Sequence, residues 1–242
     1  MDNLLSDSDI SQTTNDLLLM VKRLNKSKSK LTYKAGCEML ILQELLKKSN
    51  KTKIGRSNLF PKLLRDKSIS FQFNQENLTI FQNGKEYIGI KPTKLEQTWL
   101  SGSKEKSEDW KEILKDLIQS LFKTERLNEN DLYYITHVVF FISDFGKRNL
   151  ELNKELLVCK NILLKFLNGK SENLDLRLEC ILAITILNRK PFITNDFNRA
   201  IKFYRKNGFV KPNINDNDEA TIYGVFHTTA VFTILSVIIN KF

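Results

Sequence analysis

The chain has 242 residues, of which 41% are hydrophobic and 27% charged, a composition typical of a folded domain rather than a disordered chain. It has only four prolines and nine glycines, too few for an all-β sandwich with many tight turns. Lys and Arg number 38 against 28 Asp and Glu, a formal net charge of +10. This excess favours an acidic partner. The frequent use of Asn, Ile and Lys is also typical of an AT-rich genome, in which Lys is the default surface residue.

The N-terminal third is expected to be helical and basic. Apolar residues recur at helical spacing over 16–24 and 32–48. Most of the net positive charge lies between Lys22 and Lys67, with few interleaved aromatic residues. That pattern indicates an acidic peptide partner more than nucleic acid, which we rank as unlikely.

A short β-ribbon is predicted at 68–90, inserted between helices. Ile69, Phe71 and Phe73 alternate with polar residues, and Asn83-Gly84 is a typical hairpin turn. A loop is expected at 91–107. We therefore divide the chain into a basic N-terminal region with a β-ribbon, 1–107, and a helical core domain, 108–242.

The core domain is predicted to consist of successive helices. The first is amphipathic, Asn130 or Asp131 is expected to cap the second, and the later ones begin near Asn, Asp or Thr caps. The expected helices are 109–122, 130–143, 151–167, 173–187, 194–207 and a last one starting near 218. The predicted fold class is mainly all-α, as an antiparallel helical array or an α/α toroid.

The segment from Tyr223 to Ile239 is strongly apolar. It is shorter than the about 20 residues of a membrane helix and contains a histidine and hydroxyl groups, so a buried central helix is favoured over a membrane anchor. The N-terminus does not have the pattern of a signal peptide. Three dispersed cysteines suggest neither disulfides nor a cysteine zinc site. A cytoplasmic protein with no membrane contact is expected.

The two histidines of the chain, His137 and His227, both lie within apolar helical segments. Tyr133, His137, Phe141 and Asp144 share one stripe of a helix, so His137 and Asp144 are expected to line one cavity. Two interpretations remain open. The histidines act as general acid and base, or as metal ligands with Asp144, or each is a core residue with a hydrogen-bond partner.

Glu179 lies near the start of another apolar helix and is a candidate to point into the same cavity, although a solvated helix start is the alternative. No HxxxH or HxxE spacing is present, so neither a metal nor another cofactor is predicted. Walker, Rossmann and GxSxG motifs are absent as well.

Three elements resemble an uncharacterised all-helical bacterial family, whose genes often lie near natural-product biosynthesis genes. They are Thr136 to Gly146, which matches THxxFxxxDFG; Asp175 to Cys180, which is similar to DLxxEL; and His227-Thr228-Thr229. The match covers about residue 131 to the C-terminus, with Arg177 and Cys180 at less typical positions. The resemblance implies one site, formed by His137, Asp144, Glu179, His227 and Thr228.

The functional hypothesis is an accessory enzyme that modifies a peptide or small molecule in a biosynthetic pathway. The alternative is a non-catalytic helical module that binds an acidic peptide or protein.

Overall fold

The computed structural model describes residues 5–26, 127–212 and 222–242, the backbone of three strands between 69 and 88, and helical positions within 35–46 and 115–119. The elements are α1 Asp7–Lys26, β1 Ile69–Asn74, β2 Asn77–Gln82, β3 Lys85–Ile88, α6 Glu129–Ile142, α7 Lys154–Leu167, α8 Leu174–Asn188, α9 Asn195–Asn207 and α10 Ile222–Ile239. The predicted mainly all-α fold with a small β-ribbon is confirmed. The loop expected at 91–107 lies outside the described residues.

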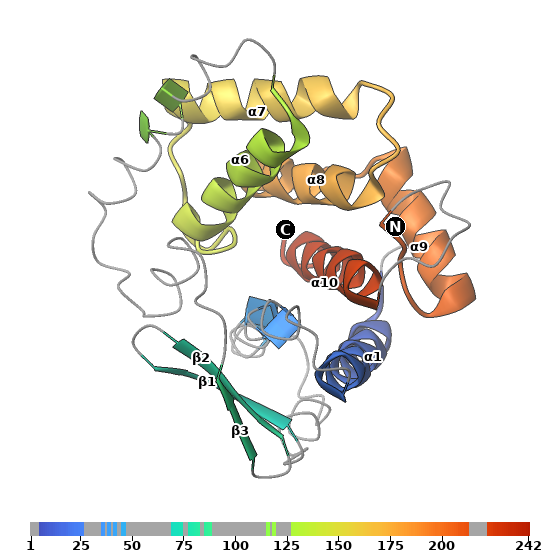
Figure 1. Ribbon diagram of the computed structural model, residues 1–242. Helices are drawn as coiled ribbons and strands as arrows, with labels where there is room; N and C mark the ends of the chain where they lie inside the picture. Colours follow the sequence, from blue (N-terminus) through green and yellow to red (C-terminus); the bar gives the residue numbers. More distant parts are fainter. Residues whose placement is uncertain are drawn as a thin grey trace.

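The ribbon is a three-stranded antiparallel sheet in the order β1-β2-β3. Phe73 of β1 is paired with Leu78 of β2, and Gln82 of β2 with Lys85 of β3. The sheet lies to one side of the helical part (Figure 1).

Local capping residues set where the helices begin. Asn128 caps α6 by accepting from the backbone N–H groups of Asn130 and Asp131, and Asp131 in turn accepts from the Asn128 backbone. The cap is therefore Asn128, and the prediction of Asn130 or Asp131 was wrong. Helices α8 and α9 are capped by Asn173 and Thr194; the sequence predicts Asn173 or Asp175 for the first start and Thr194 or Asn195 for the second.

Helices α8 and α10 form the centre of the molecule. All residues of α8 from Leu174 to Leu187 are buried, and α8 contacts α6, α7, α9 and α10. Helix α10 lies between α8 and α1, so both of its sides are covered (Figure 1). Such central helices carry apolar side chains all round and have no solvated face.

Helix α10 has the length and composition of a membrane span, and it is the one such helix among the described residues. Inside the fold, 72% of that span is buried. Its hydroxyl groups bond to backbone carbonyls one turn earlier, as Thr233 does to Thr229 and Ser236 to Phe232. These bonds satisfy polar groups that would otherwise be costly in a core.

Candidate functional site

Three central helices present polar side chains to one another. Helix α6 contributes Tyr133, Thr136 and His137, whose spacing of three and four residues places them on one face. Helix α8 contributes Asp175 and Glu179, which are four residues apart and share a face for the same reason.

Helix α10 contributes Tyr223 and His227, again four residues apart. The helical segment that includes positions 35–46 contributes Glu38, which is 9% exposed. The site is therefore assembled from four helices that are far apart in the sequence.

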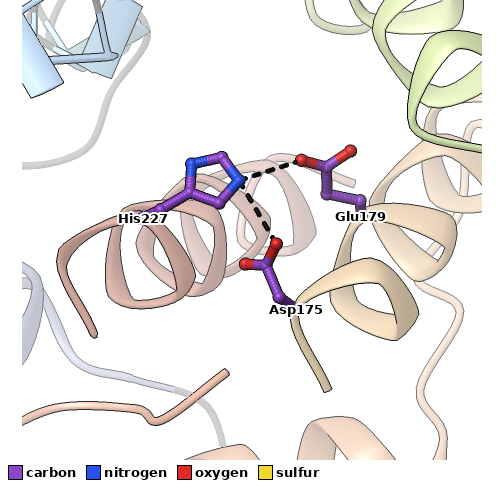
Figure 2. A group of neighbouring side chains, drawn as sticks. All are labelled: Asp175, Glu179 and His227. Atoms are coloured by element: carbon purple, nitrogen blue, oxygen red, sulfur yellow. Dashed lines mark ion pairs between the residues drawn. The ribbon is translucent and has the colours of Figure 1, made fainter. Parts of the chain in front are cut away.

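The two histidines converge on one carboxylate oxygen. His137 Nε2 lies 3.4 Å from Glu179 Oε1, and His227 Nε2 lies 3.3 Å from the same atom. His227 Nε2 is also 3.3 Å from Asp175 Oδ2, so two carboxylates approach one ring nitrogen, as Figure 2 shows. The structure thus brings together His137, His227 and Glu179, three of the residues predicted for the site. We call these residues together with Asp175 the histidine–carboxylate cluster.

Hydroxyl groups hold two carboxylates of the cluster in place. Thr136 donates a hydrogen bond of 2.5 Å to Glu179 Oε2, the oxygen that faces away from the histidines. Tyr133 donates one of 2.7 Å to Asp175 Oδ2. Both donors are on α6, so this helix fixes the orientation of the α8 carboxylates.

Glu38 lies on the other side of the His227 ring. Its Oε1 accepts a hydrogen bond of 2.8 Å from the Tyr223 hydroxyl and is 3.0 Å from His227 Nδ1. The Nδ1 contact is close, but its direction does not satisfy hydrogen-bond geometry. Glu38 Oε2 and Asp175 Oδ1 are buried without a hydrogen-bond partner.

Burial and charge act in opposite directions on these groups. Burial alone would raise the pKa of Glu179, which is 1% exposed, but the His137 and His227 imidazoles hold it well below its usual range. Burial alone would lower the pKa of His227, but the carboxylates of Asp175 and Glu38 raise it well above its usual value. Both shifts favour the charged forms of the cluster.

A cavity of about 50 Å³ opens beside the cluster. A buried water needs about 10–15 Å³, so the space admits a group of several atoms. Its polar lining consists of Glu38, Glu179 and the two histidines, and the remaining residues are apolar: Ile41, Phe140, Phe141, Phe145, Leu182, Ala230, Val231 and Ile234. The His137 side chain is 30% exposed and connects this polar end to solvent.

Two residues predicted for the site do not line this cavity. Helix α6 ends at Ile142, and Asp144, Phe145 and Gly146 follow with positive φ angles of 48°, 51° and 78°. The chain turns there, so the helical stripe does not continue to Asp144. Its carboxylate pairs with Lys147 Nζ at 3.6 Å, and Phe145 lines the cavity in its place.

Thr228 likewise has a local partner within its own helix. It is fully buried in α10, and its hydroxyl donates a hydrogen bond of 3.0 Å to the Gly224 carbonyl.

Five members of the site were missed by sequence reasoning: Glu38, Tyr133, Thr136, Asp175 and Tyr223. Asp175 has a signal, because it is four residues before Glu179 on one helix face. Tyr133 was placed on the correct stripe but without a role. Glu38 has no such signal, since its segment is far from the other helices in sequence.

Comparison with known proteins places the chain in a family. Residues 93–237 match the family described as a domain of unknown function, DUF6895, and this match covers more than half of the chain. The chain belongs to the DUF6895 family. No curated protein and no solved structure matches it. The DUF6895 match includes His137, Asp175, Glu179 and His227, whereas Glu38 lies before it.

Proposed function

We propose that the chain is an enzyme that modifies a small molecule or a peptide, with the histidine–carboxylate cluster as its reaction centre. The observation that carries this proposal is the convergence of two imidazoles on one carboxylate oxygen. His137 and His227 come from different helices, and both approach Glu179 Oε1, at 3.4 and 3.3 Å. Imidazole and carboxylate groups are the side chains that most often move protons in enzymes.

The alternative for the histidines is a structural role in the core. A structural histidine needs one donor and one acceptor for its ring nitrogens. Here Glu38, Asp175 and Glu179 surround His227 within 3.0 to 3.3 Å, and buried oxygens of Glu38 and Asp175 have no hydrogen-bond partner. So much buried charge is more than packing requires and is typical of functional sites.

The cavity indicates the kind of substrate. Its aromatic and aliphatic wall suits an apolar part of the ligand, and the reacting polar group would then lie against the histidines. Glu38 and Glu179 in the lining disfavour an acidic group at this position. An acidic peptide, the partner expected from the net charge, would have to bind elsewhere on the chain.

A place in a biosynthetic pathway and a cytoplasmic location are parts of the same proposal. Both rest on the sequence: the pathway on the resemblance of its THxxFxxxDFG and HTT elements, and the location on its three dispersed cysteines, which suggest no disulfide framework.

The test is a search for conversion with a matched pair of variants. The purified chain is incubated with fractionated small-molecule and peptide extracts, with and without added divalent metal ions, and followed by mass spectrometry. We expect the wild-type chain to consume a compound that Glu179→Gln leaves untouched. Glu151→Gln, the same chemical change at an exposed position, should retain full activity.

Circular dichroism and gel filtration check that both variants fold. Conversion by Glu179→Gln at the wild-type rate would contradict the proposal. Binding of acidic peptides without conversion of any compound would favour the non-catalytic module instead.

A further inference from the structure

The donor atoms of the cluster have the spacing of ligands around one metal ion. One donor atom each from Asp175, Glu179 and His227 lie within 4.8 Å of one another. His227 Nε2 is 3.3 Å from Glu179 Oε1 and 3.3 Å from Asp175 Oδ2. His137 Nε2 contacts Glu179 Oε1 at 3.4 Å but is not one of these three mutually close donors.

These distances agree with a tetrahedral site. Zinc binds histidine nitrogen and carboxylate oxygen at about 2.0–2.1 Å, which places neighbouring ligand atoms about 3.3–3.4 Å apart at the tetrahedral angle. The N–H of one imidazole nitrogen forms one good hydrogen bond, yet His227 Nε2 faces two carboxylate oxygens at equal distance. A cation between the atoms accounts for this arrangement better than a hydrogen bond does.

Buried charge gives a second, independent indication of a cation. Asp175 is 5% exposed, and its Oδ1 has no hydrogen-bond partner. Glu38, Asp175 and Glu179 together bring three carboxylates to two imidazoles, so the site has a surplus of negative charge when the histidines are neutral. A buried carboxylate oxygen without a partner is costly, and a divalent cation would offset that cost.

Residues around the cluster have the contacts of an outer shell. Thr136 and Tyr133 hydrogen-bond the carboxylates of Glu179 and Asp175. Glu38 Oε1 is 3.0 Å from His227 Nδ1, on the side of the ring opposite to Nε2. Proteins usually orient a metal-bound imidazole by a hydrogen bond from its other nitrogen to a carboxylate. Glu38 lies at the right distance for this role, although the direction of the contact does not form that bond here.

We propose that the chain binds one divalent first-row transition metal ion, of the Zn²⁺ class, through His227 Nε2, Glu179 and Asp175, with the fourth position open to water or substrate. An imidazole with two carboxylates suits Zn²⁺, Fe²⁺ or Mn²⁺, whereas Mg²⁺ and Ca²⁺ prefer sites made of oxygen ligands alone. This inference shares its residues with the proposed function and would add a metal-bound water as the group that activates the substrate.

The test uses the full-length chain, stripped with a chelator and titrated with ZnCl₂ in a calorimeter. A Cys37→Ser background removes one thiol that could bind zinc on its own. We expect one equivalent of Zn²⁺ to bind and the melting temperature to rise with zinc concentration. Binding of Co²⁺ should give the intense visible absorption of tetrahedral cobalt.

Variants at the ligands decide the outcome. Glu179→Gln and Asp175→Asn keep side-chain shape, and each should weaken zinc binding by at least about 100-fold, beyond the 10–100-fold typical of outer-shell changes. Glu151→Gln should bind zinc as the wild-type chain does. Wild-type affinity in both ligand variants, or no zinc binding by the folded wild-type chain, would overturn the inference.

The two proposals can fail separately. Conversion of substrate by the chelator-treated chain would support the enzyme and refute the metal as its reaction centre. Zinc binding that depends on Glu179, in a chain that converts no compound, would support the metal site alone.

Discussion

Helix α8 carries two buried groups of charges that are built differently. On one side Arg177 donates 2.9 Å and 2.7 Å contacts to Asp196 and hydrogen bonds to the carbonyls of Leu167 and Gly169. On the other side Asp175 and Glu179 face the histidines.

The Arg177 group is balanced and complete. One positive charge meets one negative charge, and the carbonyls of Gly169 and Leu167 accept hydrogen bonds from Nη1 and Nη2. The histidine–carboxylate cluster has a surplus of carboxylates, a buried Asp175 oxygen without a partner and a cavity at its side. The first group therefore has the composition of a structural ion pair, whereas the second has buried carboxylate oxygens without partners beside a cavity.

The largest expected loss of stability comes from replacing Arg177. Arg177→Met leaves Asp196 buried without its partner, so we expect the free energy of unfolding to fall by about 3–5 kcal/mol. Urea unfolding measures this loss. Arg199→Met, the same change at an exposed position of α9, should alter stability by less than about 0.5 kcal/mol.

A double variant sharpens this result. Replacing both partners, as Arg177→Met with Asp196→Leu, removes the unpaired charge and should recover much of the lost stability. If Arg177→Met alone is as stable as the wild-type chain, the pair does not hold the fold and the contrast between the two groups disappears.

The next effect concerns pH and the metal-free protein in chelator. The pKa of Glu179 is lowered in the folded chain, so its contribution is present above its ordinary value of 4.5 and is lost as pH falls through the lowered pKa. The pKa of His227 is raised, so its contribution is complete below 6.5 and is lost as pH rises through the raised pKa. The cluster therefore stabilises the metal-free chain most between about pH 4.5 and pH 6.5, where both contributions are complete.

Unfolding measured from about pH 3 to pH 9 checks this expectation. Asp175, Glu38 and Glu179 face His227 and account for its raised pKa, so His227→Asn should flatten the alkaline limb of the profile. A wild-type stability that falls above pH 6.5 no more steeply than that of the variant would contradict the assignment.

A smaller effect on stability is expected for Asp175, which lies on α8 two residues before Arg177. Asp175→Asn keeps the shape of the side chain and its bond to Tyr133, and it removes one charge from a cluster with a surplus. We expect the metal-free chain to change in stability by less than about 1 kcal/mol, since the charge also contributes a helix-terminus interaction of this order. A loss as large as that of Arg177→Met would show that both groups are structural.

The sequence predicts the helices well because their signals are local. Asn173 and Thr194 act as caps where the sequence places them, and apolar spacing predicts a buried α10. The convergence of His137 with His227 could only be suggested, because it depends on how α6, α8 and α10 pack.

Two features of the site could not be predicted, because one depends on where a helix ends and the other on a contact between helices that are far apart in sequence. Asp144 shares a helical stripe with His137 in the sequence, yet three successive positive φ angles begin at that residue and end the stripe. Glu38 reaches His227 from a helix nearly 200 positions earlier, which no local pattern signals. Asp175 was within reach, since its spacing of four from Glu179 places both carboxylates on one face.

The last expected effect separates binding from folding in the cluster. Tyr133 donates to Asp175, and burial together with that carboxylate raises the pKa of its phenol, so it remains a donor at any working pH. Tyr133→Phe removes this bond and should cost about 0.5–1.5 kcal/mol of stability. Zinc affinity should fall by about 10–100-fold, because Asp175 is then no longer oriented.

Tyr134→Phe is the matched control, because the neighbouring tyrosine is 43% exposed. It should change neither stability nor zinc affinity. Equal zinc affinity in Tyr133→Phe and the wild-type chain would mean that Asp175 needs no support from α6. The cluster would then differ from the Arg177 group only in its carboxylates and histidines, and the hydrogen bond from Tyr133 would contribute nothing to metal affinity.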